Sequence, residues 1–124
     1  MGVPILKQGD VLIASIQDAL ADADLLELQT ELAQQAGRHR ARGAIIDVTA
    51  LDVLDSFSCR TLREIVEILR LRGTETVIVG VQPVVAHAMV RLGLTLGSGT
   101  SVLDLEEGLA HLRRGARGRP ANGG

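Results

Sequence analysis

Short apolar runs alternate with amphipathic stretches along the chain, and their spacing predicts an α/β fold. The strand-like runs are rich in β-branched residues and cover residues 11–16, 44–48 and 76–81, with residues 5–6 as a shorter run ahead of them. Between and after them, apolar positions recur at helical spacing in residues 24–42, 58–72 and 83–93. Such alternation predicts a mainly parallel sheet with right-handed crossovers, and the N-terminal strand is expected to add antiparallel pairing at one edge.

Capping residues predict where the helices begin and end. Asp24, with a glutamate three residues later, is expected to start the first helix, and Gly43 is expected to stop it. Gly73 should end the second helix, and Pro83 suits the first turn of the third. Asp104 is expected to cap a further helix, which makes about four in all.

The length and composition are those of one ordinary globular domain. The 124 residues are 46% hydrophobic and 23% charged, and we expect residues 1–114 to form the domain and residues 115–124 to be a disordered tail. The apolar runs are much shorter than the roughly 20 residues that a bilayer span needs, and the N-terminus lacks a secretory pattern. A cytoplasmic protein without a membrane partner is therefore expected.

Composition also argues against nucleic acid as a partner. Phe57 is the only aromatic residue, so the chain lacks the stacking surfaces that hold single-stranded nucleic acid. The formal net charge of -2 provides no general attraction for phosphate backbones.

The sequence lacks the motifs of a cofactor-dependent or metal-dependent enzyme. Residues 97–99 (Gly-Ser-Gly) lack the third glycine of a dinucleotide fingerprint, and no phosphate-binding loop occurs. The histidines, His39, His87 and His111, share no ligand spacing with Cys59, which falls in a helical pattern and is expected to be a packed thiol. We therefore expect no metal, no cofactor and no catalysis.

Polar residues gather in residues 49–58, between a predicted strand and a predicted helix, where parallel sheets place their functional loops. Asp52 and Asp55 could share a face for acid–base work, but no histidine is near Ser56 to activate it as a nucleophile. Helix capping by these oxygens is the simpler interpretation. The functional alternative is that another protein phosphorylates Ser56, and that the new charge weakens a complex packed on Phe57.

The region around this loop resembles the STAS (anti-anti-sigma factor) family. The resemblance begins with Ala-Ile-Ile-Asp-Val at residues 44–48 and Leu-Asp-Val-Leu-Asp-Ser at residues 51–56. Further similarity, to the single-domain stressosome branch of the family, lies in Pro4–Lys7, Ser15–Gln17, Asp55–Phe57, Gly80–Pro83, Leu92-Gly93 and Asp104–Leu109. The resemblance implies the STAS fold over nearly the whole predicted domain.

The resemblance also implies a function without catalysis. It implies a scaffold that forms a large homo- or hetero-oligomer with larger STAS sensor paralogues and holds a serine switch kinase of the GHKL type. Ser56 would be the phosphoacceptor, and Asp52, Asp55, Phe57 and Ser58 would contact partners. Phosphorylation would release the kinase, and a PP2C-type phosphatase would reset the serine. The kinase would bring the ATP, so this chain needs no cofactor.

One segment departs from the common family pattern. Ordinary anti-anti-sigma factors usually carry a Gly-Leu-Gly-like segment after the Asp-Ser pair, whereas residues 57–60 here are Phe-Ser-Cys-Arg. This departure favours the stressosome branch over the alternative, a freely soluble anti-anti-sigma factor that sequesters an anti-sigma kinase. Ser58 is expected to cap the second helix.

Overall fold

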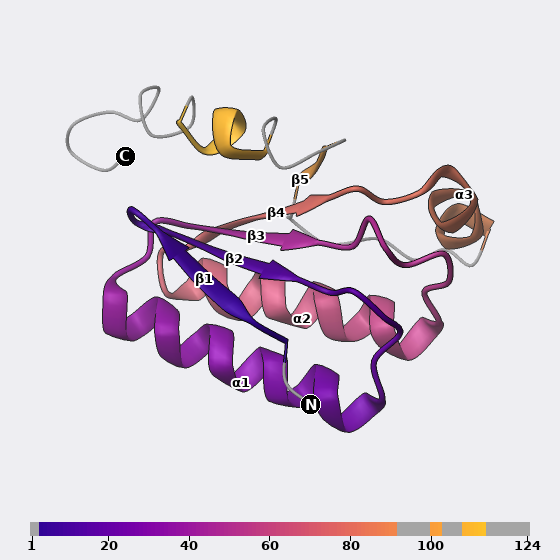
Figure 1. The fold of residues 1–124 in the computed structure, drawn as a ribbon, viewed down its shortest axis with the longest axis horizontal. Coiled ribbons are helices and arrows are strands. Elements are labelled where there is room, and N and C mark those ends of the chain that lie inside the picture. The colour runs from indigo at the N-terminus through magenta and orange to yellow at the C-terminus, as the bar shows by residue number, and fades with distance from the viewer. Residues whose placement is uncertain (1–2, 92–99, 103–107, 114–124) are drawn as a thin grey trace.

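The computed structural model describes residues 3–91, 100–102 and 108–113, which form one sheet with helices against it (Figure 1). The strands follow the chain in the order β1-β2-β3-β4-β5. The first pair is antiparallel and the others are parallel, as the sequence predicted. Their bounds are β1 (Ile5–Gln8), β2 (Val11–Ser15), β3 (Gly43–Asp47), β4 (Glu75–Val79) and β5 (Thr100–Val102).

Helices occupy the connections between the parallel strands. They are α1 (Asp22–His39), α2 (Ser56–Leu71) and α3 (Pro83–Arg91), and residues 108–113 are also helical. In Figure 1, α1 and α2 lie side by side under one face of the sheet. The α/β class and the approximate number of helices are therefore confirmed.

Alternation along the strands creates two separate cores. The side chains that pack with α1, α2 and α3 include Leu12, Ala14, Ala44, Ile46 and Ile78. The opposite face carries Val11, Ile13, Ile45, Val77 and Val79, which pack with Leu112 and Leu109 of the last helical segment. Because the central strands are buried on both faces, they appear in the sequence as continuous apolar runs.

Both predicted ends of α1 were wrong. The helix begins after Ala21 without a side-chain cap, and Asp24 lies in the first turn, where the helix dipole favours a carboxylate. It ends at His39, and Arg40 then adopts the left-handed conformation with φ 49°. Gly43, the expected stop, is instead the first residue of β3. Left-handed backbone is normally adopted by glycine, so an arginine at this position does not signal the turn.

Other predicted ends were confirmed. Gly73 follows α2 with φ +82°, and α3 begins at Pro83. The strand β5 was not predicted, because its three residues are too few to show an alternating pattern. Asp104 and residues 115–124 lie outside the described residues, so the predicted cap and tail are not described.

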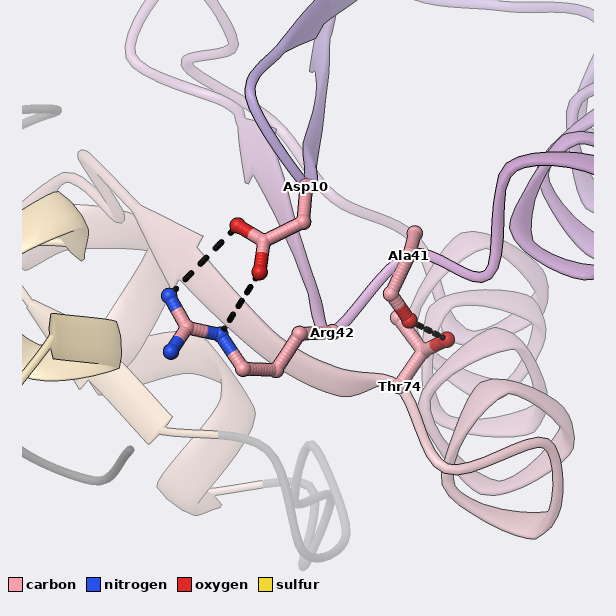
Figure 2. A network of polar contacts seen from close by, with 4 residues as sticks. All are labelled: Asp10, Ala41, Arg42 and Thr74. Atoms are coloured by element: carbon pink, nitrogen blue, oxygen red, sulfur yellow. Dashed lines mark hydrogen bonds and ion pairs between the residues drawn. The ribbon is translucent and has the colours of Figure 1, made fainter. Parts of the chain in front are cut away.

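The end of the sheet where β2, β3 and β4 begin, which we call the base end, is closed by polar contacts (Figure 2). The Arg42 guanidinium pairs with the Asp10 carboxylate, with Nε 3.2 Å from Oδ2. The buried Thr74 hydroxyl donates to the Ala41 carbonyl at 2.7 Å. Backbone bonds run beside these contacts, from Arg42 N–H to the Asp10 carbonyl (2.8 Å) and from Glu75 N–H to the Arg42 carbonyl (3.0 Å).

No helix in the described part of the chain combines the length and the apolar character required to cross a bilayer.

Candidate phosphorylation and partner-binding site

Ser56 lies at the opposite end of the sheet from the base end, where residues 48–55, here called the switch loop, connect β3 to α2 (Figure 1). It is the first residue of α2, and Asp55 is the N-cap, with extended backbone at φ -79° and ψ 175°. An Asp55 carboxylate oxygen accepts from the Ser58 N–H at 2.8 Å. The prediction that Ser58 caps the helix was therefore wrong, because Ser58 supplies the donor and Asp55 the acceptor.

The environment of Asp55 favours its charged form. Hydrogen bonds from the Ser58 backbone and then from the Ser58 side chain lower the pKa of Asp55 below its ordinary value of 3.8, against a smaller opposing effect of burial. The positive charge of Arg60, one turn along the helix, lowers this pKa further. The start of α2 thus carries a carboxylate that is ionised at neutral pH.

The switch loop presents its tip to solvent. Asp52 and Asp55 are exposed, Val53 is 69% exposed, and Ser56 is half-buried. Within the described chain, the Ser56 hydroxyl has no side-chain hydrogen-bond partner. Phe57 and Ser58 are also half-buried. The five residues that the sequence singled out therefore lie together at one helix start, with Ser56 among them.

The end of β3 and the β4–α3 connection fix the first residues of the switch loop. Asp47 accepts from both the N–H (2.9 Å) and the hydroxyl (2.6 Å) of Thr49. From the β4–α3 connection, the Gln82 side chain donates to the Thr49 carbonyl at 2.8 Å. Gly80, in the same connection, has φ +79°, and a Cβ there would overlap the Thr49 hydroxyl. We call the set of residues that make these contacts, Asp47, Thr49, Gly80 and Gln82, the foundation of the switch loop. It fixes the backbone from which the exposed tip extends.

The arrangement of Asp47, Thr49 and Gln82 was not predicted from the sequence. An aspartate at a strand end followed two residues later by threonine is a local signal for a side-chain-to-backbone turn, and it could have been recognised. The bond from Gln82 joins residues 33 positions apart, so no local sequence pattern predicts it.

An apolar groove runs beside the helix start, between α1 and the switch loop. Its lining includes Leu20, Leu25, Val53, Leu54 and Leu62. Asp55 and Ser58 also line this groove. Apolar side chains beside an exposed loop give a partner a surface on which to pack.

Neither the histidines nor the cysteine forms a metal site in the described part of the chain. Among the described residues, no three or more His, Cys, Asp or Glu side chains gather as metal ligands. His111 instead lies 3.0 Å from a carboxylate oxygen of Glu75. Cys59 is fully buried, as predicted, and burial followed by the charge of Asp55 raises the pKa of its thiol. A buried thiol held in its neutral form is a poor nucleophile.

Comparison with known proteins identifies the fold family. The STAS domain model matches residues 3–100. A serine-to-glutamate variant of RsbS from Moorella thermoacetica is 34% identical, with a TM-score of 0.82 over 93% of this chain and 97% of that one. A chain in a structure described as the molecular architecture of the stressosome, a signal integration and transduction hub, is 35% identical. Its TM-score is 0.80 over 92% of this chain and 99% of its own length.

A curated relative points the same way. The RsbT co-antagonist protein RsbRA of Bacillus subtilis (strain 168) is 28% identical over 72 residues, which is 58% of this chain. The match covers 26% of RsbRA, so this chain spans about a quarter of that relative's length. With a family model over most of its residues and the five-stranded mixed sheet described above, the chain belongs to the STAS domain family.

Proposed function

We propose that this chain is a non-enzymatic stressosome scaffold that holds a serine switch kinase and releases it when Ser56 is phosphorylated. The observation that carries the proposal is the position of Ser56, at the start of α2 with its hydroxyl unengaged by any described side chain. Two solved relatives support it, an RsbS variant at 34% identity and a chain of the stressosome at 35%. The proposal places the chain in the cytoplasm.

The proposed partners follow from the same relatives. RsbRA is named as a co-antagonist of RsbT, so we assign to this chain larger STAS paralogues as neighbours in an assembly and a GHKL-type kinase as the released partner. A PP2C-type phosphatase would remove the phosphate. The contact surface for the kinase would be formed by the residues next to Ser56 in the switch loop and the first turn of α2: Asp52, Asp55, Phe57 and Ser58.

Phosphorylation would change the charge of this surface strongly. A phosphate adds about 1.5 to 2 negative charges beside Asp52 and Asp55, which already carry negative charge at the same helix start. A docked kinase that fits the neutral serine would then face desolvated like charges, which weakens an interface by a few kcal/mol. The same modification should leave the fold intact, because Ser56 lies at the start of α2, outside both cores.

The direct test is phosphorylation by a GHKL-type serine switch kinase, followed by mass-spectrometric site mapping. We expect one phosphate on Ser56, complete loss of labelling in Ser56→Ala, and normal labelling in the matched control Ser58→Ala. Phosphate on another residue, with Ser56 untouched, would contradict the proposal.

Kinase binding provides the second measurement. The unmodified protein should retain the kinase in a pull-down, and genuinely phosphorylated protein should bind it at least tenfold more weakly, which corresponds to about 1.4 kcal/mol. Equal affinities for the two forms would refute release by phosphorylation.

Light scattering separates the scaffold from a freely soluble anti-anti-sigma factor. The chain, alone or mixed with a larger STAS paralogue, should form a very large particle if it is a scaffold. A stable monomer or dimer under both conditions would favour the alternative.

A further inference from the structure

We propose that Arg60 binds the phosphate on Ser56 and holds it against the surface of α2. This inference rests on the proposed function, since it concerns the phosphorylated form of the same site. It adds a residue that positions the phosphate, and it explains how a doubly charged group is accommodated beside two aspartates.

The helical spacing puts the two residues on one face. Ser56 is the first residue of α2, and Arg60 lies four positions later in the same helix. Residues four apart on a helix are surface neighbours, with Cβ atoms about 5 to 6 Å apart. An acidic group that precedes a basic one at this spacing is the more favourable orientation. Phosphorylation of Ser56 creates this order.

Arg60 is available for such a contact. Its side chain is exposed, and within the described residues no ion pair engages it. Two other arginines differ, because Arg42 pairs with Asp10 at 3.2 Å and Arg70 pairs with Glu67 at 2.9 Å. A planar guanidinium can form two parallel hydrogen bonds to a phosphate, so Arg60 matches the new group in geometry as well as in charge.

Two neighbouring carboxylates, those of Asp55 and Glu64, could compete with the phosphate for the Arg60 guanidinium. Its positive charge already reaches Asp55, whose pKa it lowers, but Asp55 is occupied by the Ser58 N–H. Glu64 follows Arg60 by four residues and is exposed. A phosphate dianion with three acceptor oxygens attracts a guanidinium more strongly than either carboxylate does. Asp52 and Asp55 meanwhile repel the phosphate from the switch loop, which favours its position on the side of Arg60.

The test uses full-length protein in which phosphoserine is incorporated at position 56 during synthesis, so no kinase is needed. A ³¹P NMR titration then measures the second ionisation of the phosphate. Because Arg60 stabilises the dianion, Arg60→Gln should decrease the second acid dissociation constant about twofold, the ratio expected for an exposed ion pair at this spacing. Arg60→Lys should restore most of the effect, and high salt should reduce it.

Arg72→Gln is the matched control, since it removes the same charge from the exposed far end of α2. In the unsubstituted protein, the Arg60 Nε–H resonance should also shift when Ser56 is replaced by phosphoserine. An unchanged titration in Arg60→Gln, or an equal change in Arg72→Gln, would overturn the inference while leaving kinase labelling of Ser56 intact. Failure of the kinase to label Ser56 would instead remove the proposed function, which separates the two outcomes.

Discussion

The two ends of the sheet use hydrogen bonds for different purposes. At the base end, the contacts tie the beginnings of strands to one another, and the Thr74 hydroxyl that takes part is buried. At the opposite end, the contacts of Asp47 and Gln82 hold only the first residues of the switch loop, and its tip stays exposed. One end is thus closed around its polar groups, whereas the other presents them to solvent.

This difference shows how a small domain separates stability from recognition. Substitutions at the base end should reduce stability without touching Ser56, and substitutions at the tip of the switch loop should change binding at little cost in stability. Substitutions in the foundation of the switch loop should change both stability and binding. Parallel sheets commonly place functional loops where strands end, because rigid strands then position mobile side chains.

The largest effect on stability is expected for Gly80→Ala, at the foundation of the switch loop. The new Cβ would overlap the Thr49 hydroxyl and lie 2.9 Å from the Thr49 Cα, in a backbone with φ +79°. Left-handed strain and overpacking together should cost about 3 kcal/mol in urea denaturation. Gly9→Ala is the matched control at the base end, since φ there is +62° but nothing lies within 4 Å. Equal losses in the two variants would show that backbone strain alone is responsible.

A smaller effect is expected for Thr74→Val at the base end. The substitution keeps the shape but leaves the Ala41 carbonyl without its donor, which should cost about 1 to 2 kcal/mol in the free energy of unfolding. Thr30→Val removes a similar bond, from a hydroxyl to the Leu26 carbonyl, on the exposed face of α1. That control should change stability by about 0.5 kcal/mol or less. Similar losses would mean that burial does not distinguish the two hydroxyls.

The smallest effect concerns the cap of α2. Asp55→Ala should cost about 1 kcal/mol, whereas Asp55→Asn should retain most of the cap. Because the pKa of Asp55 is lower in the folded state, its charge contributes stability above the ordinary value of 3.8 and loses that contribution as the pH falls through the folded value. The stability difference between wild type and Asp55→Asn should therefore shrink on acidification, by a small amount because the side chain is exposed. A pH-independent difference would contradict this account.

The fold was largely predictable because its strands and helices carry strong apolar periodicity. The runs at β2, β3 and β4 are buried on both faces, and α2 has one apolar face. The local sequence was therefore enough to tell strand from helix in each case. The ends of α1 were harder to predict. Alanine is not a usual N-cap residue and arginine is not a usual left-handed C-cap residue, yet Ala21 and Arg40 occupy these two positions. There, tertiary packing decides the geometry.

The residues of the candidate site were predictable only in part. Asp52, Asp55 and Ser56 lie in one short segment, so their proximity follows from the chain itself. Ser58 was expected to cap α2, but Asp55 is the residue that accepts, and the sequence does not separate the two because both residue types cap helices about equally well. The bond from Gln82 to Thr49 depends on β3 and β4 being neighbours, which the sequence suggests only through the fold as a whole.

The order of strands in space equals their order along the chain, and this has a consequence during synthesis on the ribosome. Each parallel strand that emerges can join the strand made just before it, while α1 and α2 cover the same side as they appear. The other side, with Val11, Ile45 and Val79, receives its described cover only when Leu112 emerges. A nascent chain that ends after β4 therefore lacks this cover, and that side is the surface that a chaperone would meet first.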